Sequence, residues 1–252
     1  MFNFDNLDFT YVPYPIGVAK PILDEAFYKQ LVASFPPLEL FEYMPTVGHK
    51  YALSETRNAK QYWNHLNENA VWKEFMAYIE GMFVKDVFRM LDDNNLNLGL
   101  VTQERSLPKR LKRWVKKDLK RGRLPERDIL FKPRFEFSAI PAMGGNIKPH
   151  TDVEQKIVSM VVSILEDGEW DPACGGATDM VFPKDPTKSF NMIGDWGLDF
   201  DEVDVLHKYE FRPNQAVFFI KTFNSWHAVQ PMTGTDPNTF RRTLTINIEL
   251  VD

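Results

Sequence analysis

RTLTINIEL, residues 242–250, alternates apolar with polar side chains and is rich in β-branched residues, as β-strands are. Five further segments after Pro133 have a similar content of β-branched and aromatic residues and are separated by Gly, Pro, Asn or Asp. They are RFEFSAI (134–140), KIVSMVVSIL (156–165), ATDMVF (177–182), NQAVFFIKT (214–222) and WHAVQ (226–230). Six strands without helices long enough for parallel crossovers predict an antiparallel sandwich or barrel.

The chain ahead of these strands has the apolar spacing of helices. Asp24 is placed to cap a first helix, and apolar residues recur three and four apart within residues 69–91. Residues 105–127 place apolar side chains on one face of a third, amphipathic helix. These patterns predict a single α+β, mainly β domain. Residues 1–130 are expected to be mostly helical support, and residues 131–252 to form the β core.

Composition limits the class of protein. The 252 residues are 44% hydrophobic and 26% charged, as in a soluble globular protein. The longest apolar run, 157–165, has about half the length of a membrane-spanning helix, and the first residues lack the pattern of a signal peptide. The single cysteine, Cys174, excludes a disulfide framework and a thiolate metal cluster. We therefore expect a cytoplasmic protein with no membrane partner.

Charge is unevenly distributed along the chain. The net charge is −5, yet residues 105–127 contain eleven Lys or Arg and two acids. A basic stretch can bind nucleic acid, but here only Trp114 supplies an aromatic side chain and the protein as a whole is acidic. A solvated helix is the expected structure, with nucleic acid an unfavoured partner.

Two histidines of the β half lie in contexts that suit a metal site. His150 lies in KPHTDVE, and in an extended backbone its side chain and that of Asp152 point to one face. His227, in NSWHAVQP, follows an apolar strand and could be the third ligand. Two imidazoles and one carboxylate suit Fe(II) and leave open coordination positions. The H-x-D spacing alone is also consistent with a surface turn.

A cation near the start of the last strand strengthens this interpretation. Arg241 lies fourteen residues after His227. A buried guanidinium is costly unless an anion pairs with it, and its fork fits a carboxylate in a bidentate way. The sequence thus combines a candidate metal site with a candidate carboxylate anchor.

The order H-x-D, then S-W-H-x-V-x-P, then R-x-T-L-T-I-N-I resembles the 2-oxoglutarate/Fe(II)-dependent dioxygenase superfamily, most closely its prolyl-hydroxylase-like branch. The resemblance covers roughly residues 133–252. It implies a double-stranded β-helix, or jelly roll, with N-terminal helices packed on the major sheet. It also implies that His150, Asp152 and His227 are the iron ligands and that Arg241 anchors the far carboxylate of 2-oxoglutarate.

The resemblance further implies the cofactors and the reaction. These are Fe(II), 2-oxoglutarate as cosubstrate and O2, with ascorbate as a reductant. The reaction would be hydroxylation of an unactivated C–H bond, with release of succinate and CO2. A carboxylate at Asp152 favours hydroxylation, or another oxidation such as desaturation, over halogenation.

Strand phase decides between the neighbouring cations Arg241 and Arg242. We favour Arg241, whose face of the strand continues through the small polar Thr243, while Arg242 shares its face with apolar residues. Thr243 and Ser138, the hydroxyl in FEFSAI, are further candidates for contact with the cosubstrate. The remaining histidines are expected in surface or loop positions: His49, His65 and His207.

The substrate is expected to be a small molecule, such as an amino acid or a natural-product intermediate. Residues 166–212 are interpreted as a long insertion that could cover the pocket as a lid. Its acids could favour a cationic substrate, although a solvated face explains them as well: Asp195, Asp199, Asp201, Glu202 and Asp204.

Other functions remain open at this point. A peptide, protein or nucleic-acid hydroxylase or demethylase of the same superfamily is one alternative. A non-enzymatic jelly-roll binding module with structural histidines is another, and a zinc hydrolase with the same ligands is a third. The zinc hydrolase leaves Arg241 without a role.

Overall fold

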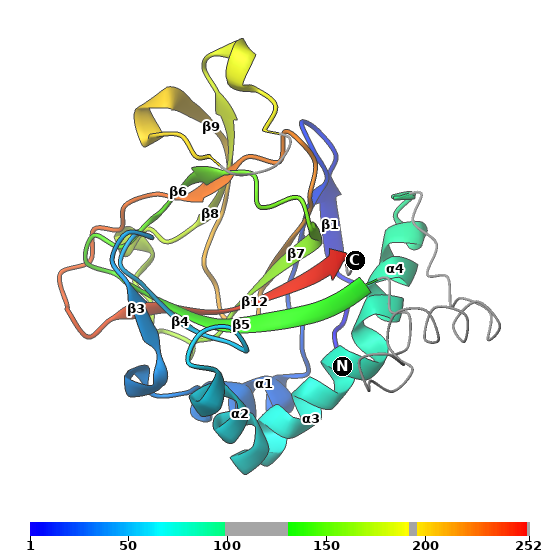
Figure 1. Cartoon of the computed structure of the whole chain (residues 1–252), viewed down its shortest axis with the longest axis vertical. Helices are drawn as coiled ribbons and strands as arrows, with labels where there is room; N and C mark the ends of the chain where they lie inside the picture. The colour runs from blue at the N-terminus through cyan, green and yellow to red at the C-terminus, as the bar shows by residue number, and fades with distance from the viewer. Residues whose placement is uncertain (99–130, 192–195, 251–252) are drawn as a thin grey trace, which may run out of the picture.

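The structure is a computed structural model and describes residues 1–98, 131–191 and 196–250. It is mostly β, with two antiparallel sheets and a layer of helices (Figure 1). The strands of the eight-stranded sheet are, in spatial order, β1 (Leu7–Thr10), β2 (Ile16–Ala19), β10 (Ala216–Ile220), β7 (Lys156–Ser163), β12 (Phe240–Leu250), β5 (Phe131–Pro141), β4 (Lys50–Leu53) and β3 (Glu42–Met44). Those of the four-stranded sheet are β6 (Ile147–His150), β11 (His227–Val229), β8 (Thr178–Pro183) and β9 (Val203–Tyr209). The antiparallel β core expected from the last 120 residues is confirmed.

The alternating pattern of β12 explains its central position. Leu244, Ile246 and Ile248 are fully buried in the main core, while the side chains of Arg241 and Thr243 lie on the opposite face. β12 pairs with β5 along its whole length and with β7 on its other side. One apolar face and one polar face therefore lie at the middle of the sheet, and the polar face is turned toward the smaller sheet.

Helices cover the apolar face of the eight-stranded sheet (Figure 1). They are α1 (Glu25–Ala33), α2 (Ala59–Glu68), α3 (Ala70–Tyr78), a π-helical turn (Ile79–Phe83) and α4 (Val84–Asp93). The Asp24 carboxylate caps α1 by accepting from the backbone N–H groups of Ala26 and Phe27 at 3.0 and 3.1 Å. Both helical predictions within the described residues, the Asp24 cap and the helix over 69–91, are confirmed.

Two expectations about secondary structure are wrong. The first third of the chain is not only helical, because it contributes β1, β2, β3 and β4 to the two edges of the eight-stranded sheet. Residues 166–212 are not a lid inserted between strands, because they contain β8 and β9 of the smaller sheet. The strands at the N-terminus have three or four residues each, too few to show a period of two.

The predicted basic helix over 105–127 and the acid Asp195 lie outside the described residues. In the part of the chain that the structure describes, no helix is long and apolar enough to cross a bilayer.

Candidate metal and cosubstrate site

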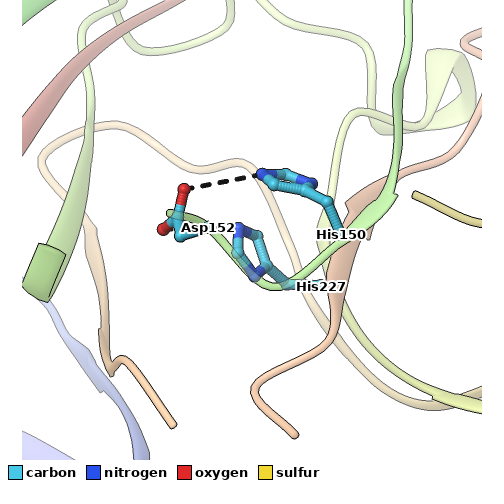
Figure 2. Close-up of side chains that lie close together, drawn as sticks. All are labelled: His150, Asp152 and His227. Carbon is cyan, nitrogen blue, oxygen red and sulfur yellow. Dashed lines mark ion pairs between the residues drawn. The ribbon is translucent and has the colours of Figure 1, made fainter. Parts of the chain in front are cut away.

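Three potential ligands converge at one end of the smaller sheet (Figure 2). His150 ends β6 and His227 begins β11, and the antiparallel register places the two residues opposite each other, with ring centroids 4.2 Å apart. The Nε2 atoms of His150 and His227 lie 3.6 and 3.9 Å from the Asp152 carboxylate oxygens. One ligand atom from each of the three residues lies within 4.8 Å of the others.

Asp152 reaches this position through a left-handed backbone conformation, with φ of 62°. The expectation that His150 and Asp152 share a face of one extended strand is therefore wrong, because β6 ends at His150. A positive φ is uncommon for a residue with a Cβ and is costly by roughly 1–3 kcal/mol, so it persists where surrounding contacts hold it. Such strain is often found at functional sites.

Both imidazoles have a defined tautomer. His150 Nδ1 lies 2.9 Å from the carbonyl oxygen of Lys148, and His227 Nδ1 lies 2.9 Å from that of Ser225. A carbonyl oxygen only accepts, so each Nδ1 carries the proton and each Nε2 keeps its lone pair. This arrangement directs the two metal-binding nitrogens toward Asp152.

The Asp152 carboxylate is buried and held by two donors. Lys156 Nζ lies 2.6 Å from one oxygen, and Ser159 Oγ lies 2.8 Å from the other. Burial opposes ionisation, but the Lys156 charge and the two histidines hold the pKa of Asp152 well below its usual range. Burial, and then the neighbouring charge of His150, lower the pKa of His227 to about 3. An ionised carboxylate and a neutral imidazole are the protonation states that metal binding requires.

The residues present fit a divalent cation. Two neutral nitrogens and one carboxylate form a three-ligand face, and the pocket beside them leaves room for further ligands. This pocket has a volume of about 120 Å³ and is open to solvent on one side. All six candidate residues from the sequence line it: Ser138, His150, Asp152, His227, Arg241 and Thr243.

Arg241 extends into the pocket from β12 and is 4% exposed. Its Nε donates to the carbonyl oxygen of Gly176 at 2.6 Å, and one Nη donates to Thr178 Oγ1 at 3.1 Å. Burial lowers its pKa to about 10. Among the described residues no carboxylate lies within ion-pair distance of it, although the charge of the buried Asp179 acts on it and opposes this lowering. Gly176, with φ of 85°, supplies the bend that brings its carbonyl here.

Arg242 has the opposite environment. Its guanidinium lies over the ring of Phe35 and forms an ion pair with Glu169 at 2.6 Å, on the other face of the sheet. Its charge is thus neutralised away from the pocket. The structure places the two adjacent arginines as the alternation of the strand predicts.

Several pocket residues were not identified from the sequence. Lys156 and Ser159 hold Asp152, but they lie in a mostly apolar strand segment. Neither is part of a sequence motif that is typical of a metal site. Lys50, Thr178 and Phe219 are further examples. His49 and His207 are exposed, as expected, but the surface prediction for His65 is wrong, because its side chain is buried between α2 and the sheet.

Two of the described acids in residues 196–204 have structural contacts. The Asp199 and Glu202 side chains form a capping box at a short 3-10 helix (Phe200–Glu202). Asp199 also forms an ion pair with Lys148, and Glu202 forms one with Lys188. For these two acids the contacts support a structural role over binding of a cationic substrate.

No family model matches the sequence, and no curated protein matches it either. Solved structures do match the fold. A prolyl 4-hydroxylase from Pseudomonas putida superposes with a TM-score of 0.53 at 16% identity, covering 94% of this chain and 93% of that one. The fold is that of the prolyl-hydroxylase-like 2-oxoglutarate/Fe(II) oxygenases.

Two further structures support this oxygenase fold. A prolyl hydroxylase from Trichoplax adhaerens, in complex with a hypoxia-inducible-factor peptide, has a TM-score of 0.50 at 10% identity and covers 93% of this chain and 83% of its own. The α-ketoglutarate-dependent epimerase SnoN, from nogalamycin biosynthesis, has a TM-score of 0.50 at 8% identity. The match covers 93% of this chain and 76% of the epimerase. One oxygenase fold thus serves different reactions, and function must be argued from the site.

Proposed function

We propose that this protein is an Fe(II)/2-oxoglutarate-dependent oxygenase that hydroxylates an unactivated C–H bond of a small molecule. The observation that carries the proposal is the joint presence, in one pocket, of the His150, Asp152 and His227 face and a buried Arg241 that forms no ion pair with the described residues. The two facing sheets would be the major and minor sheets of a double-stranded β-helix, within one domain over 1–252.

Each pocket residue has a role in this proposal. His150, Asp152 and His227 would hold Fe(II), and Arg241 would bind the far carboxylate of 2-oxoglutarate, with the Ser138 and Thr243 hydroxyls beside it. When bound, Fe(II) and 2-oxoglutarate would supply the oxidising chemistry with O2, and succinate and CO2 would be released. The protein supplies orientation and a partly enclosed pocket, and the Asp152 carboxylate favours hydroxylation over halogenation.

The test is anaerobic titration of Fe(II) and 2-oxoglutarate, followed by succinate measurement in air. We expect a weak visible charge-transfer band and O2-dependent succinate formation. His150→Ala and His227→Ala should each abolish Fe(II) binding at micromolar metal with an unchanged circular dichroism spectrum, because a two-ligand site loses chelation and facial geometry together. His207→Ala, an exposed histidine of β9, is the control and should behave as wild type.

Full turnover in either ligand variant would contradict the ligand assignment. Hydrolytic activity that survives without O2 would favour a zinc hydrolase instead. Absence of both the band and succinate would favour a binding module.

A further inference from the structure

Lys221 is a half-buried cation beside the candidate metal site, at the end of β10. It directly follows this strand, and the ring of the strand residue Phe219 lines the pocket and lies 4.2 Å from the His227 ring. Its Nζ donates to Thr151 Oγ1 at 3.1 Å, and Thr151 immediately precedes Asp152. The ammonium group therefore contacts the residue that precedes a candidate metal ligand.

The charge of Lys221 has no ion-pair partner among the described residues. The nearby Asp152 is already paired with Lys156 at 2.6 Å, so Lys156 is neutralised and Lys221 is not. Burial and the like charge of Lys156 lower the pKa of Lys221, while Asp152 raises it. A half-buried ammonium without a counter-ion favours an anionic ligand, because pairing offsets its loss of hydration.

Lys221 is not among the residues that line the pocket of Arg241 and the three candidate ligands. A 2-oxoglutarate molecule held in that pocket between Arg241 and the metal would therefore not contact the ammonium group. The anion at Lys221 would then belong to a second molecule.

Apolar side chains lie beyond Lys221. Phe223, two residues further on, is 52% exposed, and Phe190 is 66% exposed. The two are neighbours, because the backbone N–H of Asn191 donates to the carbonyl oxygen of Phe223 at 2.7 Å. These rings offer an apolar contact surface for the body of a ligand whose anionic group is bound at Lys221.

We propose that Lys221 binds a carboxylate of the primary substrate, which is an apolar small molecule carrying a carboxylate group. The inference rests on the proposed function and deepens it. It also replaces the cationic substrate considered from the acidic residues 195–204, of which Asp199 and Glu202 make structural contacts. The carboxylate would lie on the side of Asp152 away from Arg241, with the substrate body near the metal face.

The experiment uses wild-type protein loaded anaerobically with Fe(II) and 2-oxoglutarate and titrated with acid and amide pairs. The pairs are 3-phenylpropionate and its amide, hexanoate and its amide, and N-acetyl-L-leucine and its amide. Perturbation of the charge-transfer band gives the dissociation constants. We expect at least one acid to bind about tenfold or more tightly than its amide, the effect of one charge-assisted contact.

Variants assign that preference to Lys221. Lys221→Met should abolish the acid preference, Lys221→Arg should retain it, and 2-oxoglutarate affinity should stay within about twofold in both. Lys60→Met, at an exposed lysine of α2, is the matched control and should keep the preference. The Arg variant shows that a loss in the Met variant reflects charge and not misfolding.

Three results would overturn the proposal: equal binding of acid and amide, no binding by any pair, or an acid preference that survives Lys221→Met. A selective loss of 2-oxoglutarate affinity in Lys221→Met would assign the lysine to the cosubstrate instead. The band itself is recorded before any acid is added. Its absence in wild type would refute the proposed oxygenase function, and this inference with it.

Discussion

Arg241 and Arg242 are adjacent in sequence, but their guanidinium groups have opposite environments. Arg241 is buried in the pocket with no carboxylate partner among the described residues, whereas Arg242 is paired with Glu169 on the far face. We predict that Arg241→Ala raises the 2-oxoglutarate concentration needed for half-maximal succinate formation by about one to three orders of magnitude, since a charge-assisted pair in such a site contributes roughly 2–4 kcal/mol. Arg242→Ala should have a much smaller effect, and the reverse order would make Arg242 the anchor.

Ser159 is the neutral residue that holds the Asp152 carboxylate. Its hydroxyl donates its one proton to a carboxylate oxygen of Asp152 at 2.8 Å, which holds that oxygen in place. We predict that Ser159→Ala weakens Mn(II) or Co(II) binding by about 10- to 100-fold in calorimetric titration, because outer contacts orient a metal ligand. Ser163→Ala, a buried serine on the same face of β7, is the control. Equal losses in both variants would indicate a general packing effect.

At the scale of elements, the contact between α2 and the eight-stranded sheet contains a buried histidine. The His65 ring packs against Phe137 with centroids 5.7 Å apart, and burial lowers its pKa. Below about pH 6.5 the unfolded chain therefore binds a proton at His65 more readily than the folded chain does. The free energy of unfolding then decreases as the pH falls, and this group contributes at most about 1.4 kcal/mol per pH unit.

We predict that His65→Gln flattens this pH dependence. The measurement is the free energy of unfolding in urea at pH 7.5 and 5.5 for both proteins. The wild type should lose more stability than the variant over this interval. Parallel changes in the two proteins would show that His65 does not contribute.

At the scale of the whole molecule, the candidate metal site connects the two sheets. Its histidines belong to β6 and β11 of the smaller sheet, while Asp152 is bonded to Lys156 and Ser159 of β7 in the larger one. A metal that binds only the folded state stabilises it by about 2.7 kcal/mol at 100 times the dissociation constant.

We therefore predict that Mn(II) or anaerobic Fe(II) raises the melting temperature and that a chelator reverses the rise. Asp152→Ala should show no metal-dependent shift, because it retains two ligands only. A similar rise in that variant would mean that the stabilising metal binds elsewhere.

Local patterns in the sequence determined much of this protein. The strands of the β half, the Asp24 cap and the helix over 69–91 follow from side-chain period and capping chemistry, which act over a few residues. The six pocket residues could also be chosen from the sequence. The order and spacing of the motifs that contain them resemble those of a known family, and this can be recognised without knowing how the strands pair. Their functional roles remain predictions.

Tertiary structure alone decided the features that depend on distant segments. The short N-terminal strands form by pairing with β10 and β5, so their own sequence carries little signal. Asp152 reaches the site because its own backbone is in the left-handed conformation. Lys221 comes next to Thr151 only because β10 pairs with β7. His65 is buried by helix packing on the sheet. Pairing register and packing are long-range properties, and a local periodicity contains no information about which partner an element meets.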